Sequence, residues 1–399
     1  MKTLKKHLLA CCLANLFCLS GCWDLVELTE LTVVGGVAVG RGEEAKYKLT
    51  LEVINAAELG PKKTGNSTPG VVYSMEGDDI SEMFKKFNIV LSRKLILSHL
   101  QIIVISEELA EEGIDEFLDF LVRDREIRND FNIVIAKGNK AKDILSVTYP
   151  FQKVSSLKLN TQLDTLKKDY GGDPGVRLKD FSDAVSSKGK EAILEMMEVK
   201  GDPEKGKELT NMQTEMPDAL VEAVGAGIFL GDRLVGQFSI EDIRNYSIIA
   251  NQLRATNYTI PCSENGVLGV RVYQAKTDVK TTYRGDRPVI DMEILLESYL
   301  ESSSCKSDLD SISTYRKYDK KISDYIEEQI FQTIQKAQEK ESDVFGFGEK
   351  MAIQRPRTFK KIENEWPKEF AKAEIKVNVK AKLRRAGLEK KSFEDPYEH

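Results

Sequence analysis

The pattern of apolar and polar positions predicts that the chain begins its folded part with alternating strands and helices. Apolar runs or period-two alternation, which are typical of strands, occupy residues 31–40, 47–54, 101–105 and 131–136. Between them, apolar residues recur at helical spacing after Asp79 and Ser106, residue types that commonly cap helices. This order predicts a mixed α/β sheet with helices packed on it.

The second half of the chain has a different pattern, with hairpins and one long helix. Gly231-Asp232, between two apolar segments, is a two-residue hairpin signal. Period-two alternation returns at 267–273, 289–300 and 373–380. Between the last two of these, residues 309–341 predict a helix whose apolar stripe consists of Ile322, Ile326, Ile330, Ile334 and Ala337. We expect an antiparallel sheet with this helix packed on one face.

These patterns together predict a multi-domain α+β protein. Residues 186–217 are rich in Lys, Glu, Gly and Met and contain the breaker Gly201-Asp202-Pro203, which favours a boundary there. The C-terminal region can be divided further into 218–256 and 257–390. The predicted organisation is a leader at 1–21, an N-terminal α/β domain at 22–200, a linker at 201–217, a C-terminal α+β region at 218–390 and a tail at 391–399.

The first 21 residues have the three parts of a secretory signal peptide. Lys2, Lys5 and Lys6 precede an apolar run that is shorter than the roughly 20 residues a membrane-spanning helix needs. The run ends in Leu-Ser-Gly-Cys, which resembles the lipobox of bacterial lipoproteins. The resemblance implies that Cys22 becomes the first mature residue and carries a diacylglyceryl group. The alternative is an ordinary secretory signal that ends in a small-residue cleavage site, with Cys22 merely next to that site.

Charge and cysteine content narrow the possible partners. The net charge is −6, and loss of a leader with three Lys and no acid makes it −9. This balance argues against a nucleic-acid partner, because such proteins need clustered Lys and Arg. Of six cysteines, only Cys262 and Cys305 remain beyond Cys22. The compartment permits a disulfide, but the sequence leaves open whether the two pair.

No pattern predicts an enzyme, a metal site or a cofactor. The mature chain retains only His99 and His399, and His99 precedes an apolar strand, where a structural role is the simpler interpretation. Zinc-binding motifs and a nucleophile elbow are missing from the sequence. The glycine-rich residues 35–42 lack the Lys and the Ser or Thr of a phosphate-binding loop. Residues 225–227 resemble the first half of a dinucleotide-binding fingerprint, but a strand-like pattern follows them where that fingerprint requires a helix. We therefore expect a non-enzymatic protein.

A family resemblance begins directly after the lipobox. Residues 21–28 read Gly-Cys-Trp-Asp-x-x-Glu-Leu, which resembles the opening of the C-subunit lipoproteins of spore germinant receptors, the Ger(x)C family. Residues 92–95, His99, 117–118, Arg123, Asp124 and Arg128 resemble the first domain of that family. Residues 227–236, 343–348, Trp366 and 384–387 resemble its C-terminal half. Gln237 and Asn245 differ from the residues that are usual at these positions in the family, and we expect the two differences to affect only one surface of the protein.

The resemblance implies a function in the spore's response to nutrient germinants. It implies a lipid-anchored, non-enzymatic subunit on the outer face of the spore inner membrane, partnered by A and B membrane subunits. Trp23, Asp24 and Glu27 are then candidates for contact with the bilayer or with a partner, although Trp23 could instead pack on the first domain. The rival function is a solute-binding lipoprotein of a transporter, but the two matched α/β lobes expected for such a protein are not visible in the pattern.

Overall fold

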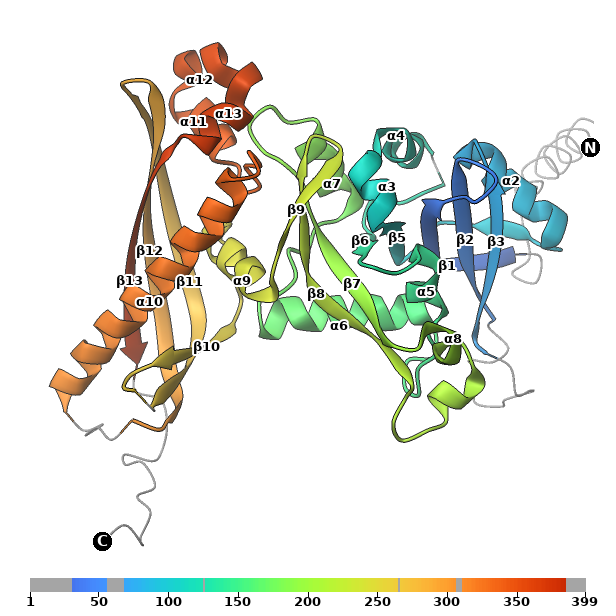
Figure 1. Cartoon of the computed structure of the whole chain (residues 1–399), viewed down its shortest axis with the longest axis horizontal. Helices are drawn as coiled ribbons and strands as arrows, with labels where there is room; N and C mark the ends of the chain where they lie inside the picture. Colours follow the sequence, from blue (N-terminus) through green and yellow to red (C-terminus); the bar gives the residue numbers. More distant parts are fainter. Residues whose placement is uncertain (1–30, 56–67, 125, 265, 306–310, 385–399) are drawn as a thin grey trace, which may run out of the picture.

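The computed structural model describes residues 31–55, 68–124, 126–264, 266–305 and 311–384. These residues form an elongated molecule with a nine-stranded sheet, the N-terminal sheet, toward one end and a four-stranded sheet, the C-terminal sheet, at the other (Figure 1). The predicted α+β multi-domain fold class is confirmed.

The N-terminal sheet has the strand order β3-β2-β1-β5-β6-β7-β8-β9, and β4 pairs with the start of β1. Strands β1, β5, β6 and β7 run parallel, and β2, β3, β8 and β9 are antiparallel to their neighbours. The bounds are β1 (Leu31–Arg41), β2 (Tyr47–Ile54), β3 (Gly70–Gly77), β4 (Lys94–Ile96), β5 (Ile102–Ser106), β6 (Asn132–Ala136), β7 (Ile193–Gly201), β8 (Ala219–Leu230) and β9 (Arg233–Phe238).

Helices cover both faces of this sheet. One face packs with α2 (Ile80–Val90), α3 (Glu107–Glu112), α4 (Asp115–Arg123) and α7 (Leu178–Val185). The other face packs with α5 (Ala141–Ser146) and α6 (Ser155–Asp169). The predicted caps are confirmed, since Asp79 accepts a hydrogen bond from the N–H of Glu82 and Ser106 from that of Leu109. The hairpin predicted at Gly231-Asp232 is also confirmed as β8–β9, and β1 and β2 form a second antiparallel hairpin.

The segment 201–217 does not separate two domains in space. It connects β7 to β8, which pair antiparallel in the same sheet, and it contains α8 (Pro203–Gly206) and the 3₁₀ helix η3 (Leu209–Met212). Asn211 is fully buried there, donates to the carbonyls of Thr148 and Ala219, and accepts from the N–H of Ala219. The change of sheet comes after β9 instead, at α9 (Ile240–Ile249). The first sheet therefore continues across the segment 201–217, because the hairpin β8–β9 completes it.

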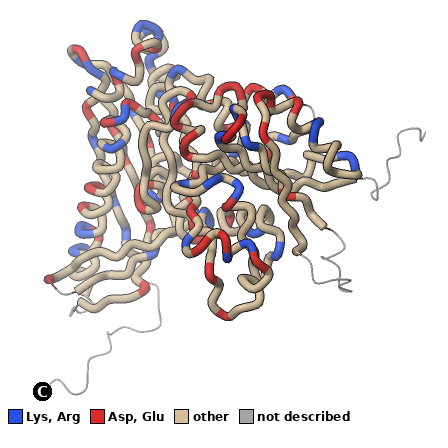
Figure 2. The backbone as a smooth tube through the Cα atoms, turned by 45° about the vertical axis from the view of Figure 1, so that its right-hand side comes forward, with Lys and Arg blue, Asp and Glu red and all other residues tan. Residues whose placement is uncertain are grey.

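The C-terminal sheet has the order β10-β11-β12-β13. Its strands are β10 (Thr256–Pro261), β11 (Val267–Arg284), β12 (Arg287–Ser303) and β13 (Glu374–Arg384). The long helix α10 (Ile312–Gln338) packs its predicted isoleucine stripe on one face of the sheet, and it carries both basic and acidic residues (Figure 2). The shorter α11 (Phe347–Gln354), α12 (Pro356–Ile362), η4 (Glu363–Glu365) and α13 (Trp366–Ala371) follow it.

One prediction about this sheet is wrong. Alternation predicted antiparallel pairing throughout, but β13 runs parallel to β12. The chain between them contains α10 to α13, and such a crossover returns a strand in the same direction. At the other edge of the sheet, Cys262 and Cys305 form a disulfide with their Cα atoms 6.4 Å apart, which settles the pairing that the sequence left open.

Candidate functional site: a polar cleft, a buried junction and the tether end

The candidate anchor and contact residues Cys22, Trp23, Asp24 and Glu27 lie outside the described residues. In the predicted lipid-anchored protein, the segment after Cys22 is a tether that joins the fold at Leu31, the first residue of β1. None of the helices in the described part of the chain is long and apolar enough to cross a bilayer.

A polar cleft of about 800 Å³ lies at the opposite end of β1. It is lined by the residues that follow the parallel strands β1, β5 and β6, where the carboxyl ends of the strands meet at one edge of the sheet. This edge is the usual place for ligands in open α/β sheets. His99 precedes β5, is exposed and is not among the lining residues.

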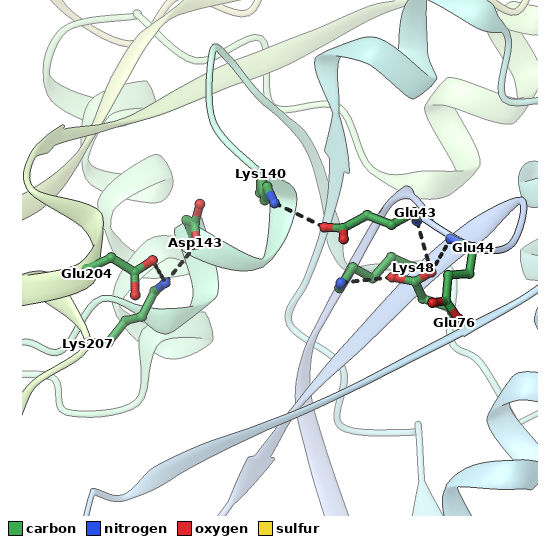
Figure 3. A network of polar contacts seen from close by, with 8 residues as sticks. All are labelled: Glu43, Glu44, Lys48, Glu76, Lys140, Asp143, Glu204 and Lys207. Atoms are coloured by element: carbon green, nitrogen blue, oxygen red, sulfur yellow. Dashed lines mark hydrogen bonds and ion pairs between the residues drawn. The ribbon is translucent and has the colours of Figure 1, made fainter.

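Glu76 fixes one wall of the cleft (Figure 3). Its carboxylate accepts hydrogen bonds of 2.9 Å from the N–H groups of Glu43 and Glu44 and from the Lys48 ammonium. The N–H of Glu44 and the charge of Lys48 lower the pKa of Glu76 to about 2. The turn between β1 and β2 is therefore held by an ionised carboxylate throughout the physiological pH range.

The other walls are joined by ion pairs and hydrogen bonds between loops. Lys140 Nζ lies 3.4 Å from the Glu43 carboxylate, and the N–H of Gly138 donates to Glu107 at 2.8 Å. Ser106 Oγ is used as the cap of α3. Among the described residues, no group of three or more His, Cys, Asp or Glu side chains is placed to hold a metal ion. The cleft thus offers hydrogen bonds and balanced charge but no pairing of a nucleophile with a base.

The glycine-rich segment 35–42 has a packing role. Gly35 and Gly36 lie inside β1, and a Cβ added to them would approach Ser156 Oγ to 2.5 Å and Leu145 Cδ2 to 2.9 Å. The glycines therefore let α5 and α6 approach the sheet closely. The burial of the nearby Glu52 was not predicted from the sequence, because this residue occupies a polar position of an alternating strand.

Glu52 is buried, and its carboxylate accepts from the N–H groups of Ser155 and Ser156 at the start of α6. Burial raises the pKa of Glu52, whereas these hydrogen bonds oppose the shift. The alternation of apolar and polar residues in β2 predicts that the side chain of Glu52 is exposed. It is buried because α6 covers it, and its carboxylate there accepts from the first N–H groups of that helix.

The family-like residues 343–348 and Trp366 meet at a junction between the two sheets. Fully buried Asp343 accepts hydrogen bonds from the N–H groups of Phe347 and Gly348 and from the Trp366 indole, at 3.1, 2.8 and 2.9 Å. A Cβ on Gly348 would lie 2.5 Å from Trp366 Nε1 and 2.7 Å from Gly189 Cα. Desolvation raises the pKa of Asp343 to about 6, although these donors favour its charged form.

Two backbone hydrogen bonds extend this junction into the N-terminal sheet. The N–H of Glu349 donates to the carbonyl of Gly189, and the N–H of Glu191 donates to the carbonyl of Asp343. Glu191 stands just before β7, so the motif joins the two sheets. The expectation that Asn245 concerns a surface is wrong: Asn245 is buried, donates to Thr333 Oγ1 and accepts from the Tyr258 hydroxyl. Gln237 is exposed, as expected.

The fold is that of a multi-domain α+β protein whose two sheets meet at a buried, hydrogen-bonded junction. Two family models match the chain: one described as "Spore germination protein N-terminal domain" at residues 24–199, and one described as "Spore germination B3/ GerAC like, C-terminal" at residues 224–387. The chain belongs to the Ger(x)C family, the C-subunit family of spore germinant receptors.

Similar proteins extend over nearly the whole chain. Spore germination protein KC of Bacillus subtilis (strain 168) is 28% identical over 386 residues, which cover 94% of each chain. Spore germination protein B3 of the same organism is 24% identical and covers 92% of this chain and 94% of its own length. The crystal structure of the GerBC protein superimposes with a TM-score of 0.57 at 18% identity, over 88% of this chain and 97% of that one. The last similarity supports the fold alone.

Proposed function

We propose that this chain is a lipid-anchored, non-enzymatic subunit of a nutrient germinant receptor. In this proposal Cys22 carries the lipid, the body lies on the outer face of the spore inner membrane, and the A and B membrane subunits are its partners. The observation that carries the proposal is the family match through both halves of the chain, behind a leader that ends in Leu-Ser-Gly-Cys.

Physical arguments support the anchor and the role as a scaffold. Two acyl chains retain a protein on a bilayer where one chain lets it escape, because each buried methylene contributes about 0.8 kcal/mol. Two backbone hydrogen bonds, Glu349 N–H to the Gly189 carbonyl and Glu191 N–H to the Asp343 carbonyl, join the two sheets of the body at the junction. Such a body serves as a rigid partner for membrane subunits.

The test is mass spectrometry and affinity purification of the tagged protein from spore membranes, with Cys22→Ala as the comparison. We expect a diacylated Cys22 in the wild type, co-purification of the A and B subunits, and release of the variant from the membrane. An unmodified Cys22, or co-purification with transporter components alone, contradicts the proposal and supports a solute-binding lipoprotein.

A second test addresses the residues next to the anchor. We propose that Trp23, with Asp24 and Glu27, contacts the bilayer interface or a partner subunit, because a tryptophan this close to the lipid lies within reach of the headgroups. Trp23→Ala should weaken co-purification of the receptor subunits while the circular dichroism and unfolding of the body stay unchanged. Unaltered co-purification contradicts this role.

A further inference from the structure

Two apolar side chains are exposed at the end of α2 where the tether enters the fold. The helix buries Ile80, Met83, Phe84 and Phe87 against the N-terminal sheet. Its last two residues, Ile89 and Val90, are instead 84% and 61% exposed. Exposed apolar residues are unremarkable when they are scattered singly, but here two are adjacent and project from the tip of a helix. They need an explanation that the fold of the domain does not supply.

Basic residues surround this apolar pair. Arg93 and Lys94 come after two intervening residues and are exposed, as is Lys85 one turn earlier in the helix. Lys86 pairs with Glu82 at 3.0 Å, whereas Lys85, Arg93 and Lys94 have no ion-pair partner among the described residues. Lys and Arg positions are visible at this end of the molecule in Figure 2. The pair is therefore flanked by uncompensated positive charge.

The fold holds these residues beside the tether. Strand β4 pairs in parallel with the first three residues of β1, so that Lys94 lies opposite Leu31. Leu95 and Leu97 are buried in the same core as α2, which fixes the segment between them and the helix. Leu31 is nine positions after Cys22 in the sequence, and a chain of that length spans at most about 30 Å.

We propose that Lys85, Ile89, Val90, Arg93 and Lys94, named here the tether-end patch, docks on the surface of an anionic phospholipid bilayer. Ile89 and Val90 enter the interfacial layer, and the three basic side chains contact lipid phosphates. This inference rests on the proposed function, because acylation of Cys22 is what keeps the bilayer within reach. A bilayer is favoured over a protein partner because exposed apolar residues ringed by unpaired basic ones, next to a lipid tether, match an anionic interface in both polarity and charge.

A second point of contact would set the orientation of the molecule. Acyl chains on Cys22 retain the protein but leave it free to tilt about the tether. In Figure 1, α2 and the start of β1 lie at the end of the long axis opposite the C-terminal sheet. Docking of the tether-end patch would therefore hold the N-terminal sheet at the membrane and direct the C-terminal sheet away from it.

The first experiment measures insertion in the acylated protein. A polarity-sensitive fluorophore is attached to Val90→Cys in the full mature protein, reconstituted in phosphatidylglycerol and phosphatidylcholine vesicles; Cys262 and Cys305 are bonded and do not compete for the label. Ile353→Cys on α11, where the native side chain is 78% exposed, is the matched control. We expect a blue shift and quenching by brominated lipid at position 90 only. Equal, water-like emission at both positions overturns the proposal.

The second experiment separates the patch from the anchor. Mature protein with Cys22→Ala lacks the anchor and should bind only weakly, so it is added to a large excess of the same vesicles and its residual binding is measured by sedimentation. Arg93→Gln with Lys94→Gln should weaken binding about 30-fold, since each basic residue near an anionic surface contributes about a five-fold factor. Ile89→Ser should also weaken binding, whereas Ile353→Ser should not. Equal binding of all variants, or no binding by any of them, overturns the proposal.

The outcomes distinguish this inference from the proposed function. Mass spectrometry that finds Cys22 unmodified contradicts the proposed function, while the vesicle binding of the Cys22→Ala protein still reports on the patch. A diacylated Cys22 with no fluorescence shift at position 90 overturns the patch alone. A shift that requires co-reconstituted A and B subunits assigns the surface to a protein contact and likewise overturns bilayer docking.

Discussion

Two carboxylates in this molecule receive the same number of hydrogen bonds and have opposite pKa shifts. Glu76, at the cleft, accepts from two backbone N–H groups and the Lys48 ammonium. Asp343, at the junction between the sheets, accepts from two backbone N–H groups and the Trp366 indole. The pKa of Glu76 is lowered to about 2, and that of Asp343 is raised to about 6.

The difference teaches that hydrogen bonds alone do not determine the charge of a carboxylate. Glu76 lies near water and has a cation among its donors, so its charged form is favoured. Asp343 is fully buried and its donors are neutral, so the cost of desolvation exceeds what they supply. Glu52 is buried under the start of α6, and burial raises its pKa as well, although two backbone N–H groups donate to it.

The largest effect is expected from Asp343→Ala. It leaves three donors without an acceptor in a buried site, and each orphaned donor costs about 1 kcal/mol or more, so the free energy of unfolding should fall by at least about 3 kcal/mol. Urea unfolding followed by fluorescence of Trp366 measures this. Asp343→Asn, which keeps one carbonyl acceptor, is the control and should lose less. A loss below about 1 kcal/mol for the alanine variant would contradict the buried hydrogen-bond network.

The pH dependence at Asp343 comes next. Because its folded pKa is above its unfolded value of 3.8, its contribution to stability is fully present below about pH 4 and is lost as the pH rises through about 6. The stability of the wild type relative to Asp343→Asn should therefore fall by roughly 2–3 kcal/mol between pH 4 and pH 8. Urea unfolding across that range measures it, and a difference that rises with pH would show that the donors outweigh desolvation.

Gly348→Ala tests the close packing at the same junction. The added methyl group would press on the Trp366 indole and on the backbone of Gly189, and overpacking of this kind typically costs about 1–3 kcal/mol. Ala352→Gly, elsewhere on α11, is a control that changes helix propensity by about 1 kcal/mol without a clash. Thermal unfolding compares the two. If Gly348→Ala is as stable as the wild type, the junction can move to accommodate the added methyl group, and the two sheets are not rigidly joined.

Glu76→Gln should have the smallest effect. We expect little change in the unfolding midpoint but faster amide hydrogen exchange at Glu43 and Glu44, whose N–H groups lose a charged acceptor. Because the folded pKa of Glu76 is lowered, its contribution is present above about pH 4.5 and is lost as the pH falls toward 2. The exchange rates of wild type and variant should converge over that range, and a constant difference would contradict an ionised carboxylate as the cause.

Local sequence patterns were sufficient to predict most of the elements. Asp79 caps α2, the two-residue turn at Gly231 joins β8 and β9, and the isoleucine stripe of α10 is buried as its spacing predicts. Such features depend on residues within a few positions of one another, which is why periodicity and capping signals reveal them. The bounds of α10 shift by only a few residues from the predicted 309–341, whereas β11 (Val267–Arg284) continues well beyond the predicted 267–273.

The site was predicted less completely. The tetrad ending in Cys22 identifies the candidate anchor from sequence alone, because signal and lipobox are linear motifs. Glu52 and Asp343 carry no local signal of burial, since an acidic residue in a strand or loop usually faces water. The exposure of Val90 was equally hidden, because it follows buried Phe87 by three residues and so continues the apolar spacing of α2.

The sequence by itself therefore determined the α+β class, the family and the type of the elements with strong periodicity, and it predicts a leader with a candidate lipid site at Cys22. Only the tertiary structure decided that β8 and β9 complete the first sheet, that β13 pairs in parallel, that Cys262 meets Cys305, and which carboxylates are buried. The physical reason is that periodicity records which side of an element is apolar. Which other element covers that side depends on contacts between residues far apart in the chain.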